Sequence, residues 1–498
     1  MTVGALNQTV VTTALPRIAS DLGGLENMSW VFTSFMVTSA ATLPIFGKLS
    51  DTHGRKRFFV GGIVVLLIGS VLAGMSQSVT QLAIYRGVQG VGSAALLANS
   101  MAIVGELFPP SQLGKWRAIN QAVMTLAAAA GPLAGGFISD HLSWQWVFYL
   151  NVPVGIVAIV VAVLVMPPFR NRNIQHRVDY LGSAMLLATI SPLLVGFAWA
   201  GQQYDWLSWQ VLGAFGTSAI SLVVFILVER RAEEPILPMT MFRNSIFSVS
   251  SMAFFLIGMG LFGSLVYLPL FAQAVQGKSA TISGLLLTPM MLASFATGFI
   301  GGHILTKWGR YRLLAFFCTG TASLGMFLLS RLGIDSTSQA MALDMAIVGI
   351  GIGIAMPLFV IVVQNAFPQK MVGVAVTSTA FVRSLGASIG VALMGTVVNK
   401  QFVSGLQSGV PDSARQAVAQ AGVVLPTTPQ PLLDPAVMSS LEAALAPSGP
   451  EVFEQVATAM QMSLVSAIDA AFLLSAVALA FACFFTLFLK EIPLRSTR

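Results

Sequence analysis

The chain consists largely of apolar runs about as long as a membrane is thick. A transmembrane helix needs about 20 mostly apolar residues, and runs of that length recur from one end of the chain to the other, separated by short polar breaks. We expect helices at 2–19, 30–47, 58–76, 80–107, 116–138, 145–166, 180–200, 209–228, 246–273, 280–304, 312–330, 341–364, 373–399 and 463–489. The pattern therefore predicts an all-α integral membrane protein with fourteen transmembrane helices.

The composition agrees with a membrane solvent and excludes several functional classes. Hydrophobic residues make up 55% of the 498 and charged residues only 9%, unlike the average soluble protein. The net charge of +7 comes with no basic run interleaved with aromatics, so we expect no nucleic-acid partner. Cys318 and Cys483 both lie inside apolar runs and are expected to be packing residues rather than a disulfide.

Motifs of soluble enzyme chemistry are absent from the sequence. There is no phosphate-binding loop and no H-E-x-x-H pattern. The four histidines lie apart in or near loops, which excludes metal-ligand spacing; they are His53, His141, His176 and His303. We therefore expect no enzyme, no metal and no cofactor, and an energy source outside this chain.

One polar segment, 401–462, is longer than the other breaks between apolar runs. It is rich in Ala, Ser, Pro and Gln and contains helix-like patches such as "DPAVMSSLEAALA" and "GPEVFEQVATAM". Most other gaps are shorter than fifteen residues, too short for a soluble domain. The segment is predicted to be a small cap outside the membrane.

Most lysines and arginines lie in loops on one side of the predicted membrane. The loops that begin near 48, 108, 167, 229, 305 and 365, together with the C-terminal tail, carry most of them. The opposite side carries only Arg17, Lys278, Arg331, Lys400 and Arg415. The positive-inside rule then predicts cytoplasmic termini and an outer 401–462 segment. The first run lacks a basic leader and a small-residue cleavage site, so it is predicted to be a span and not a signal peptide.

The cytoplasmic loops contain an internal repeat. "GKLSDTHGRKR" at 47–57 returns as "GHILTKWGRYR" at 302–312 with one constant offset. The repeat predicts two six-helix bundles, at 1–166 and 246–498, with two inserted linker helices at 167–245. Duplicated bundles are typical of secondary transporters that alternate access to a midplane site. The alternative is a chance match of two loops rich in glycine and arginine.

Taken together, these motifs resemble the fourteen-helix drug:proton antiporter branch of the major facilitator superfamily. The resemblance covers nearly the whole chain, from "LNQTVVTTALP" at 6–16 to "KEIPLR" at 490–495. It implies the major-facilitator-type fold and a multidrug efflux activity.

The first loop copy carries the residues of the family's switch loop: Gly47, Asp51, Gly54, Arg55 and Lys56. Gly54 permits a tight turn, and Asp51 can accept hydrogen bonds from arginines or from a helix N-terminus. The resemblance implies that this loop governs the change between inward and outward states. A plain positive-inside anchor is the alternative. The second copy has Thr306 in place of Asp51.

Two arginines are predicted to lie inside helices, where a charge is costly and marks a functional hypothesis. Arg86 begins "RGVQGVGSAA", which is similar to the family's fourth-helix motif, and the resemblance implies a role in proton coupling. Snorkelling of Arg86 to the interface is the alternative. Arg383 lies near the middle of its predicted helix, within "FVRSLGASIGVALMGT".

The stretch "LAAAAGPLAGG" at 126–136 is similar to the family's fifth-helix antiporter signature. Its motif residues are Ala127, Gly131, Pro132, Gly135 and Gly136. Small residues every four positions form one face that permits close packing, and Pro132 removes a backbone hydrogen bond. The resemblance implies packing between the two halves in an exporter. Close packing without any directional role is the alternative.

Polar and aromatic side chains on several helices are candidates for the substrate cavity. They are Asn7, Gln8, Phe35, Asn120, Gln121, Tyr267 and Gln273. Phe35 stands where the family commonly has tyrosine. Aromatics at helical spacing also occur in plain cores, which is the alternative for this set.

A proton-coupled exporter needs a titratable group that both states expose in turn. The resembling family has an aspartate at the position of Asn7, and an amide cannot bind and release a proton in the physiological range. Only six residues precede Asn7, which leaves open a longer native N-terminus. The remaining acids near membrane depth are Glu106, Asp344 and Asp469, for which a solvated helix end or a cap is the alternative.

The resulting prediction is a monomeric, multi-pass exporter of the inner or plasma membrane. It would move small amphipathic, often cationic, compounds outward by alternating access in exchange for protons. A lipid or glycolipid exporter of the same fold is a second hypothesis. A membrane sensor or scaffold that does not transport is a third.

Overall fold

The computed structural model describes residues 10–11, 13–15, 17–18, 20–23, 28–107, 110–167, 179–201, 203–232, 235–308, 310–433 and 435–493. Within these ranges the chain is helical, and the β-structure is one isolated bridge between Ala200 and Tyr204. Asn7 and Gln8 lie outside the described residues. The all-helical membrane architecture expected from the apolar runs is confirmed.

The helices of the first part of the chain follow the predicted runs. They are α2 (Met28–His53), α3 (Arg55–Gly74), α4 (Val79–Leu107), α5 (Pro110–His141), the short α6 (Trp146–Tyr149) and α7 (Asn151–Val165). Before them, short helical pieces lie between residues 10 and 22. Gly54 joins α2 to α3 with φ at 102°, so the expected tight turn requires a residue without a side chain.

The second part begins with the predicted inserted pair, α8 (Tyr180–Trp199) and α9 (Trp209–Arg231). It continues through η2 (Met239–Arg243), α10 (Ser245–Leu270), the π-helix η3 (Phe271–Val275), α11 (Ala280–Trp308), α12 (Tyr311–Leu329), α13 (Ser338–Ala366) and α14 (Gln369–Gly409). It ends with α15 (Asp412–Gln420), η4 (Gln430–Leu432), α16 (Pro435–Leu445), η5 (Ala446–Ser448) and α17 (Pro450–Thr486).

Eleven helices within the described ranges are long and apolar enough to cross a membrane. Two further helices, α4 and α5, have 29 and 32 residues. The count of fourteen spans stays a prediction.

Two helices are longer than the apolar runs that predicted them. α14 has 41 residues and α17 has 37, whereas the hydropathy pattern places their ends near 373–399 and 463–489. A helix of 41 residues is about 60 Å long, roughly twice the apolar thickness of a bilayer. In their extra turns Phe402, Leu406 and Met460 are buried in one apolar cluster, where α14 packs against α17. This packing holds the polar segment helical where hydropathy alone predicts a break.

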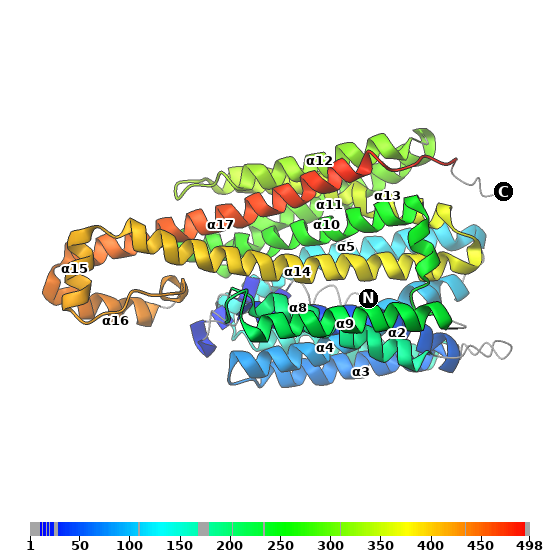
Figure 1. The fold of residues 1–498 in the computed structure, drawn as a ribbon, viewed down its shortest axis with the longest axis horizontal. Helices are drawn as coiled ribbons and strands as arrows, with labels where there is room; N and C mark the ends of the chain where they lie inside the picture. The colour runs from blue at the N-terminus through cyan, green and yellow to red at the C-terminus, as the bar shows by residue number, and fades with distance from the viewer. Residues whose placement is uncertain are drawn as a thin grey trace.

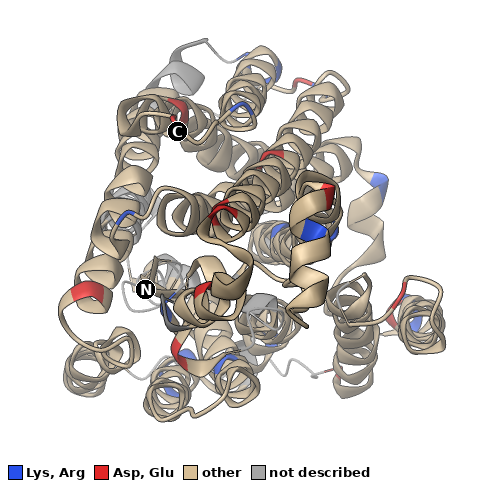
Figure 2. Cartoon of the chain, turned by 90° about the vertical axis from the view of Figure 1, so that its left-hand side faces the viewer, with Lys and Arg blue, Asp and Glu red and all other residues tan. Residues whose placement is uncertain are grey.

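The 401–462 segment forms a compact projection at one end of the bundle. α15 and α16 stand beyond the ends of the other helices, while the C-terminus lies at the opposite end (Figure 1). We call these the cap end and the loop end. Looking onto the cap end, most of the ribbon carries neither sign of charge (Figure 2), as expected for helices surrounded by lipid.

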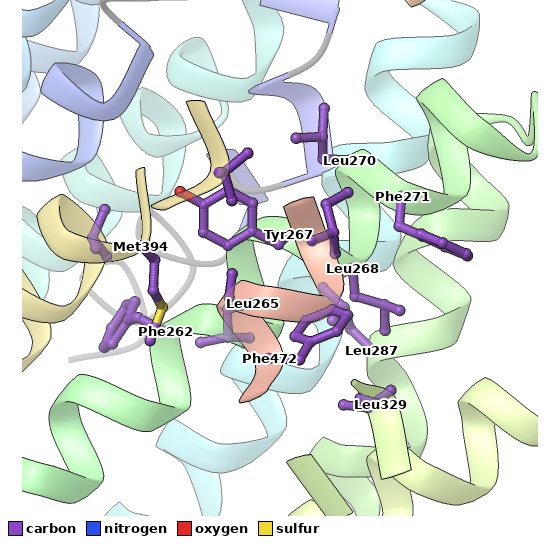
Figure 3. Close-up of a cluster of buried hydrophobic side chains, with 14 of the residues drawn as sticks. Phe262, Leu265, Tyr267, Leu268, Leu270, Phe271, Leu287, Leu329, Met394 and Phe472 are labelled. Atoms are coloured by element: carbon purple, nitrogen blue, oxygen red, sulfur yellow. The ribbon is translucent and has the colours of Figure 1, made fainter. Parts of the chain in front are cut away.

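The helices pack in two groups. α2, α3, α4 and α7 pack together in a first bundle, and α10 to α14 with α17 in a second. α5 and the pieces between residues 10 and 22 precede α7 in the chain and are counted with the first, although α5 packs mainly against α11 of the second. A single apolar cluster runs through both groups, and its part in the second contains Phe262, Leu265, Phe271 and Phe472 (Figure 3). The division into domains at 1–166, 167–245 and 246–498 remains a prediction.

The pair α8 and α9 packs against both bundles. Leu186 and Ile190 of α8 share an apolar cluster with Val37 of α2 and Phe381 of α14. At the cap end the Thr396 hydroxyl of α14 donates to the Ala200 carbonyl, at 2.7 Å. The inserted pair thus covers one side of the boundary between the bundles.

Candidate functional site

Near the cap end, α5 of the first bundle packs backbone to backbone against α11 of the second. A Cβ at Gly136 would meet the backbone of Ala280 and Thr281, and one at Gly284 would meet the backbone of Pro132. Both positions therefore admit only glycine without a backbone shift. Small residues of this kind let two membrane helices touch along their backbones.

A short helical piece at 13–15 and its neighbours pack into the same place. Gly135 lies against the Val10 carbonyl and the Thr13 hydroxyl. The fully buried Thr13 hydroxyl is 3.2 Å from the Pro132 carbonyl, to which it can donate. Ala127 is also buried, at 7% exposure. The predicted stripe on α5 thus faces neighbouring helices, with Gly135 against the first piece and Gly136 against α11.

Two polar contacts cross from one bundle to the other at the cap end. The Gln273 amide of η3 donates to the Thr13 carbonyl at 3.2 Å. The Asp140 carboxylate, in the last turn of α5, accepts from the backbone N–H groups of Ala280 at 3.1 Å and Thr281 at 2.7 Å, and from the Thr281 hydroxyl. The first N–H groups of a helix lack partners within the helix. Asp140 therefore caps α11 from the other bundle.

Asp140 is a functional candidate that the sequence reasoning missed. A signal was present, because a carboxylate in the last turn of a helix opposes the helix dipole and calls for a partner elsewhere. Which helix supplies that partner is decided by the packing of residues 140 positions apart.

The segment that leads into α11, residues 276–279, is hydrogen-bonded to the second bundle. The Gln276 amide donates to the carbonyls of Ile334 at 3.2 Å and Ser336 at 2.8 Å. The Lys278 ammonium donates to the Ser338 hydroxyl at 2.7 Å, and partial burial lowers the pKa of Lys278. The segment is therefore held to the second bundle, so the contacts with Thr13 and Asp140 join the two bundles.

Arg86 lies fully buried inside the first bundle. Its Nε donates to the Val31 carbonyl at 3.3 Å, one terminal nitrogen donates to the Gln89 side chain at 2.8 Å, and the guanidinium lies 4.3 Å from the centre of the Phe35 ring. These partners hold the Arg86 guanidinium inside the bundle, and its role in proton coupling stays a prediction. A buried charge is tolerated only with such hydrogen bonds and ring contacts.

The Gln89 amide in turn donates a hydrogen bond to the Ser70 hydroxyl, at 2.7 Å. Ser70 also accepts from the Asn151 amide, at 3.4 Å. The sequence reasoning singled out Arg86 and Phe35 separately, and the structure brings them together.

The other predicted charges lie apart from Arg86. Arg383 is near the middle of α14, where its carbonyl lies against Gly258 of α10. Asp344 of α13 and Asp469 of α17 are partly buried. One Asp469 oxygen is buried and has no hydrogen-bond partner among the described residues. The side chain of Glu106 lies outside the described residues.

The switch-loop residues lie at the loop end. Lys56 donates to the carbonyls of Val163 at 2.9 Å and Met166 at 2.6 Å, which ties α3 to the end of α7. Gly47 has open space beside it, and Arg55 opens α3. The side chain of Asp51 lies outside the described residues.

The predicted cavity residues are distributed over several settings. Tyr267 is buried at 7% exposure among Leu265, Leu268 and Leu270 (Figure 3). Asn120 and Gln121 lie in α5, and their side chains are outside the described residues. A role in substrate binding stays a prediction for this set.

Comparison with known proteins identifies relatives over the whole chain. The model of the family described as Major Facilitator Superfamily matches residues 1–391. The multidrug transporter protein MdtP of Bacillus subtilis is 34% identical over 519 aligned positions, covering 100% of this chain and 92% of that protein. Multidrug resistance protein 3 of the same organism is 37% identical, covering 84% of this chain and 82% of its own length.

The fold has relatives among solved structures. A bacterial homolog of the human lysosomal transporter Spinster, in an inward-facing and unoccupied conformation, superposes with a TM-score of 0.58 at 15% identity. The alignment covers 98% of this chain and 95% of that one. The resemblance seen in the motifs is confirmed by these matches.

Proposed function

The chain belongs to the major facilitator superfamily and is a membrane transporter rather than an enzyme, and from this premise we propose that it exports small drug-like amphipathic molecules. In this proposal the chain crosses the cytoplasmic membrane fourteen times with both termini in the cytoplasm, and the cap end faces outward. Transport follows alternating access between the 1–166 and 246–498 bundles and is driven by proton influx.

The observation that carries the proposal is the character of the contact between the bundles at the cap end. Among the described residues, Asp140 and Gln273 supply hydrogen bonds that cross it, and those of the exposed Asp140 lie where water can replace the partner. The glycine contacts between α5 and α11 let the backbones touch without interlocking side chains. Such a contact can close in one state and open in the other.

Both relatives named above are called multidrug proteins, which supports a drug-like substrate. The resembling family has an aspartate at the position of Asn7, so in this chain the proton must bind to another residue. We propose Asp344 and Asp469, both partly buried, for proton binding. Arg86 is fully buried and Arg383 half-buried, and we propose them as the positive charges within the two bundles.

The test is transport in proteoliposomes with and without an imposed pH gradient. A fluorescent amphipathic cation is the probe, and a fluorescent phospholipid analogue is the competing cargo. We expect uptake of the cation to follow the gradient in the native chain. Movement of the lipid analogue alone would favour the lipid exporter, and movement of neither would contradict the transport proposal.

Asn7→Asp measures how much the missing acid matters. If proton binding lies elsewhere, the substitution leaves the dependence on the gradient unchanged. If the native chain is uncoupled and Asn7→Asp restores coupling, then the proposal for Asp344 and Asp469 is wrong.

A further inference from the structure

The segment after α17, residues 487–493, crosses the loop end of the second bundle as an ordered strap. It leaves α17 and runs past the first turn of α12 toward the C-terminus (Figure 1). Leu489 is 1% exposed, so the strap is packed and not merely adjacent. The buried Tyr311 hydroxyl donates to the Lys490 carbonyl at 2.7 Å and accepts from the Ile492 N–H at 2.6 Å.

Glu491 of the strap caps α12. Its Oε1 accepts from the backbone N–H of Arg312 at 3.1 Å. Arg310, the residue at the N-cap position, makes no side-chain hydrogen bond of its own to the helix. A carboxylate at a helix N-terminus accepts from a backbone N–H that has no partner within the helix, and its charge complements the helix dipole. The cap that the local sequence lacks is therefore supplied from the chain's far end.

The strap also reaches the end of α13. The Asn365 amide, in the last turn of α13, donates to the Pro493 carbonyl at 3.1 Å. The strap is thus held at α12 and α13 and is continuous with α17. It joins three helices of one bundle at the loop end.

The helix that Glu491 caps directly follows the second copy of the repeated loop. Arg310 and Arg312 end the second copy, "GHILTKWGRYR", and align with Arg55 and Arg57 of the first. At the same offset, Thr306 stands where the first copy has Asp51. The second copy therefore lacks its own acid, and the strap brings one to the helix that follows it.

We propose that Glu491 takes the place of that acid and is a positioning residue for the conformational change of the second bundle. The strap then belongs to the switching machinery and makes α12, α13 and α17 move as one body. The transport part of this proposal rests on the function proposed above, whereas the capping part does not.

Hydrogen exchange tests the capping part without any transport measurement. In Glu491→Gln the amide protection at 311–314 should fall about twofold to fivefold, because glutamine keeps one acceptor oxygen but loses the charge that complements the helix N-terminus. The matched control is Glu454→Gln, an exposed acid near the other end of α17, which should leave protection at 311–314 unchanged. Unchanged protection in Glu491→Gln would overturn the proposal whatever the protein transports.

Transport kinetics test the switching part. We expect Glu491→Gln to lower Vmax about fivefold to tenfold with KM unchanged, since the residue is remote from the cap-end contact between the bundles. Thr306→Asp in the same chain should restore Vmax by returning the acid to the loop. A loss that Thr306→Asp does not restore would overturn the equivalence with Asp51.

A second variant keeps the test open if Glu491→Gln does not fold. Asn365→Ala releases the strap from α13 while leaving Glu491 in place, and it should raise exchange at 311–314 in the same direction. Exchange equal to that of the native chain would show that the strap does not hold α12. Absence of transport in the native chain would refute the proposed function but leave the exchange result intact.

Discussion

Replacing Asp140 by asparagine should weaken the contact that joins the bundles at the cap end. The carboxylate accepts from two backbone N–H groups at the start of α11 and from the Thr281 hydroxyl. Asparagine keeps one carbonyl oxygen, loses the charge, and turns an NH2 group toward a donor. Loss of a helix-capping interaction costs about 1 kcal/mol, which is a shift of about fivefold in a two-state equilibrium.

This magnitude is modest because Asp140 is an exposed residue, and water replaces part of what is lost. The free-energy cost of Asp140→Asn would be larger if the Asp140 carboxylate were buried away from water. The direction follows from linkage: a contact made only in the state closed at the cap end stabilises that state alone.

Spin-label distance measurements can follow this equilibrium. Labels at Leu142 and Ile282, both exposed near the cap ends of α5 and α11, would be placed in a chain whose two cysteines are replaced by serine. Asp140→Asn should raise the ratio of the longer-distance to the shorter-distance population about fivefold. The control Asp412→Asn removes an exposed acid of α15 and should change nothing. An unchanged distribution in Asp140→Asn would refute the capping role.

Three further substitutions test other contacts. Gly284→Leu would force a side chain into the backbone of Pro132, so we expect loss of transport with the protein folded, measured by uptake and by size-exclusion profile. Arg86→Gln removes the charge above the Phe35 ring and one hydrogen bond to a carbonyl, and should lower the melting temperature by an amount that reflects about 2 kcal/mol. Tyr311→Phe deletes both hydrogen bonds of the hydroxyl to the strap and should cost about 1–3 kcal/mol in thermal unfolding, whereas a melting temperature equal to that of the native chain would show that the strap is not held there.

Hydropathy and motif spacing alone determined the class of the protein. Runs of apolar residues set the helices, because a bilayer leaves a spanning chain few other ways to satisfy its backbone. The glycine stripe around Gly131 and Gly135 predicted close packing on α5, and Gly54 predicted the turn after α2, since both depend on properties of single residues. The family then followed from the order of the motifs.

Only the tertiary structure decided which groups meet. Asp140 caps α11, Gln273 reaches Thr13, and Glu491 caps α12 across separations of 140 residues or more. Hydropathy predicts whether a segment lies in the membrane or in water, but not which residues it contacts. The helical length of α14 was missed for a related reason, because its polar turns are stabilised by packing against α17 and not by the membrane.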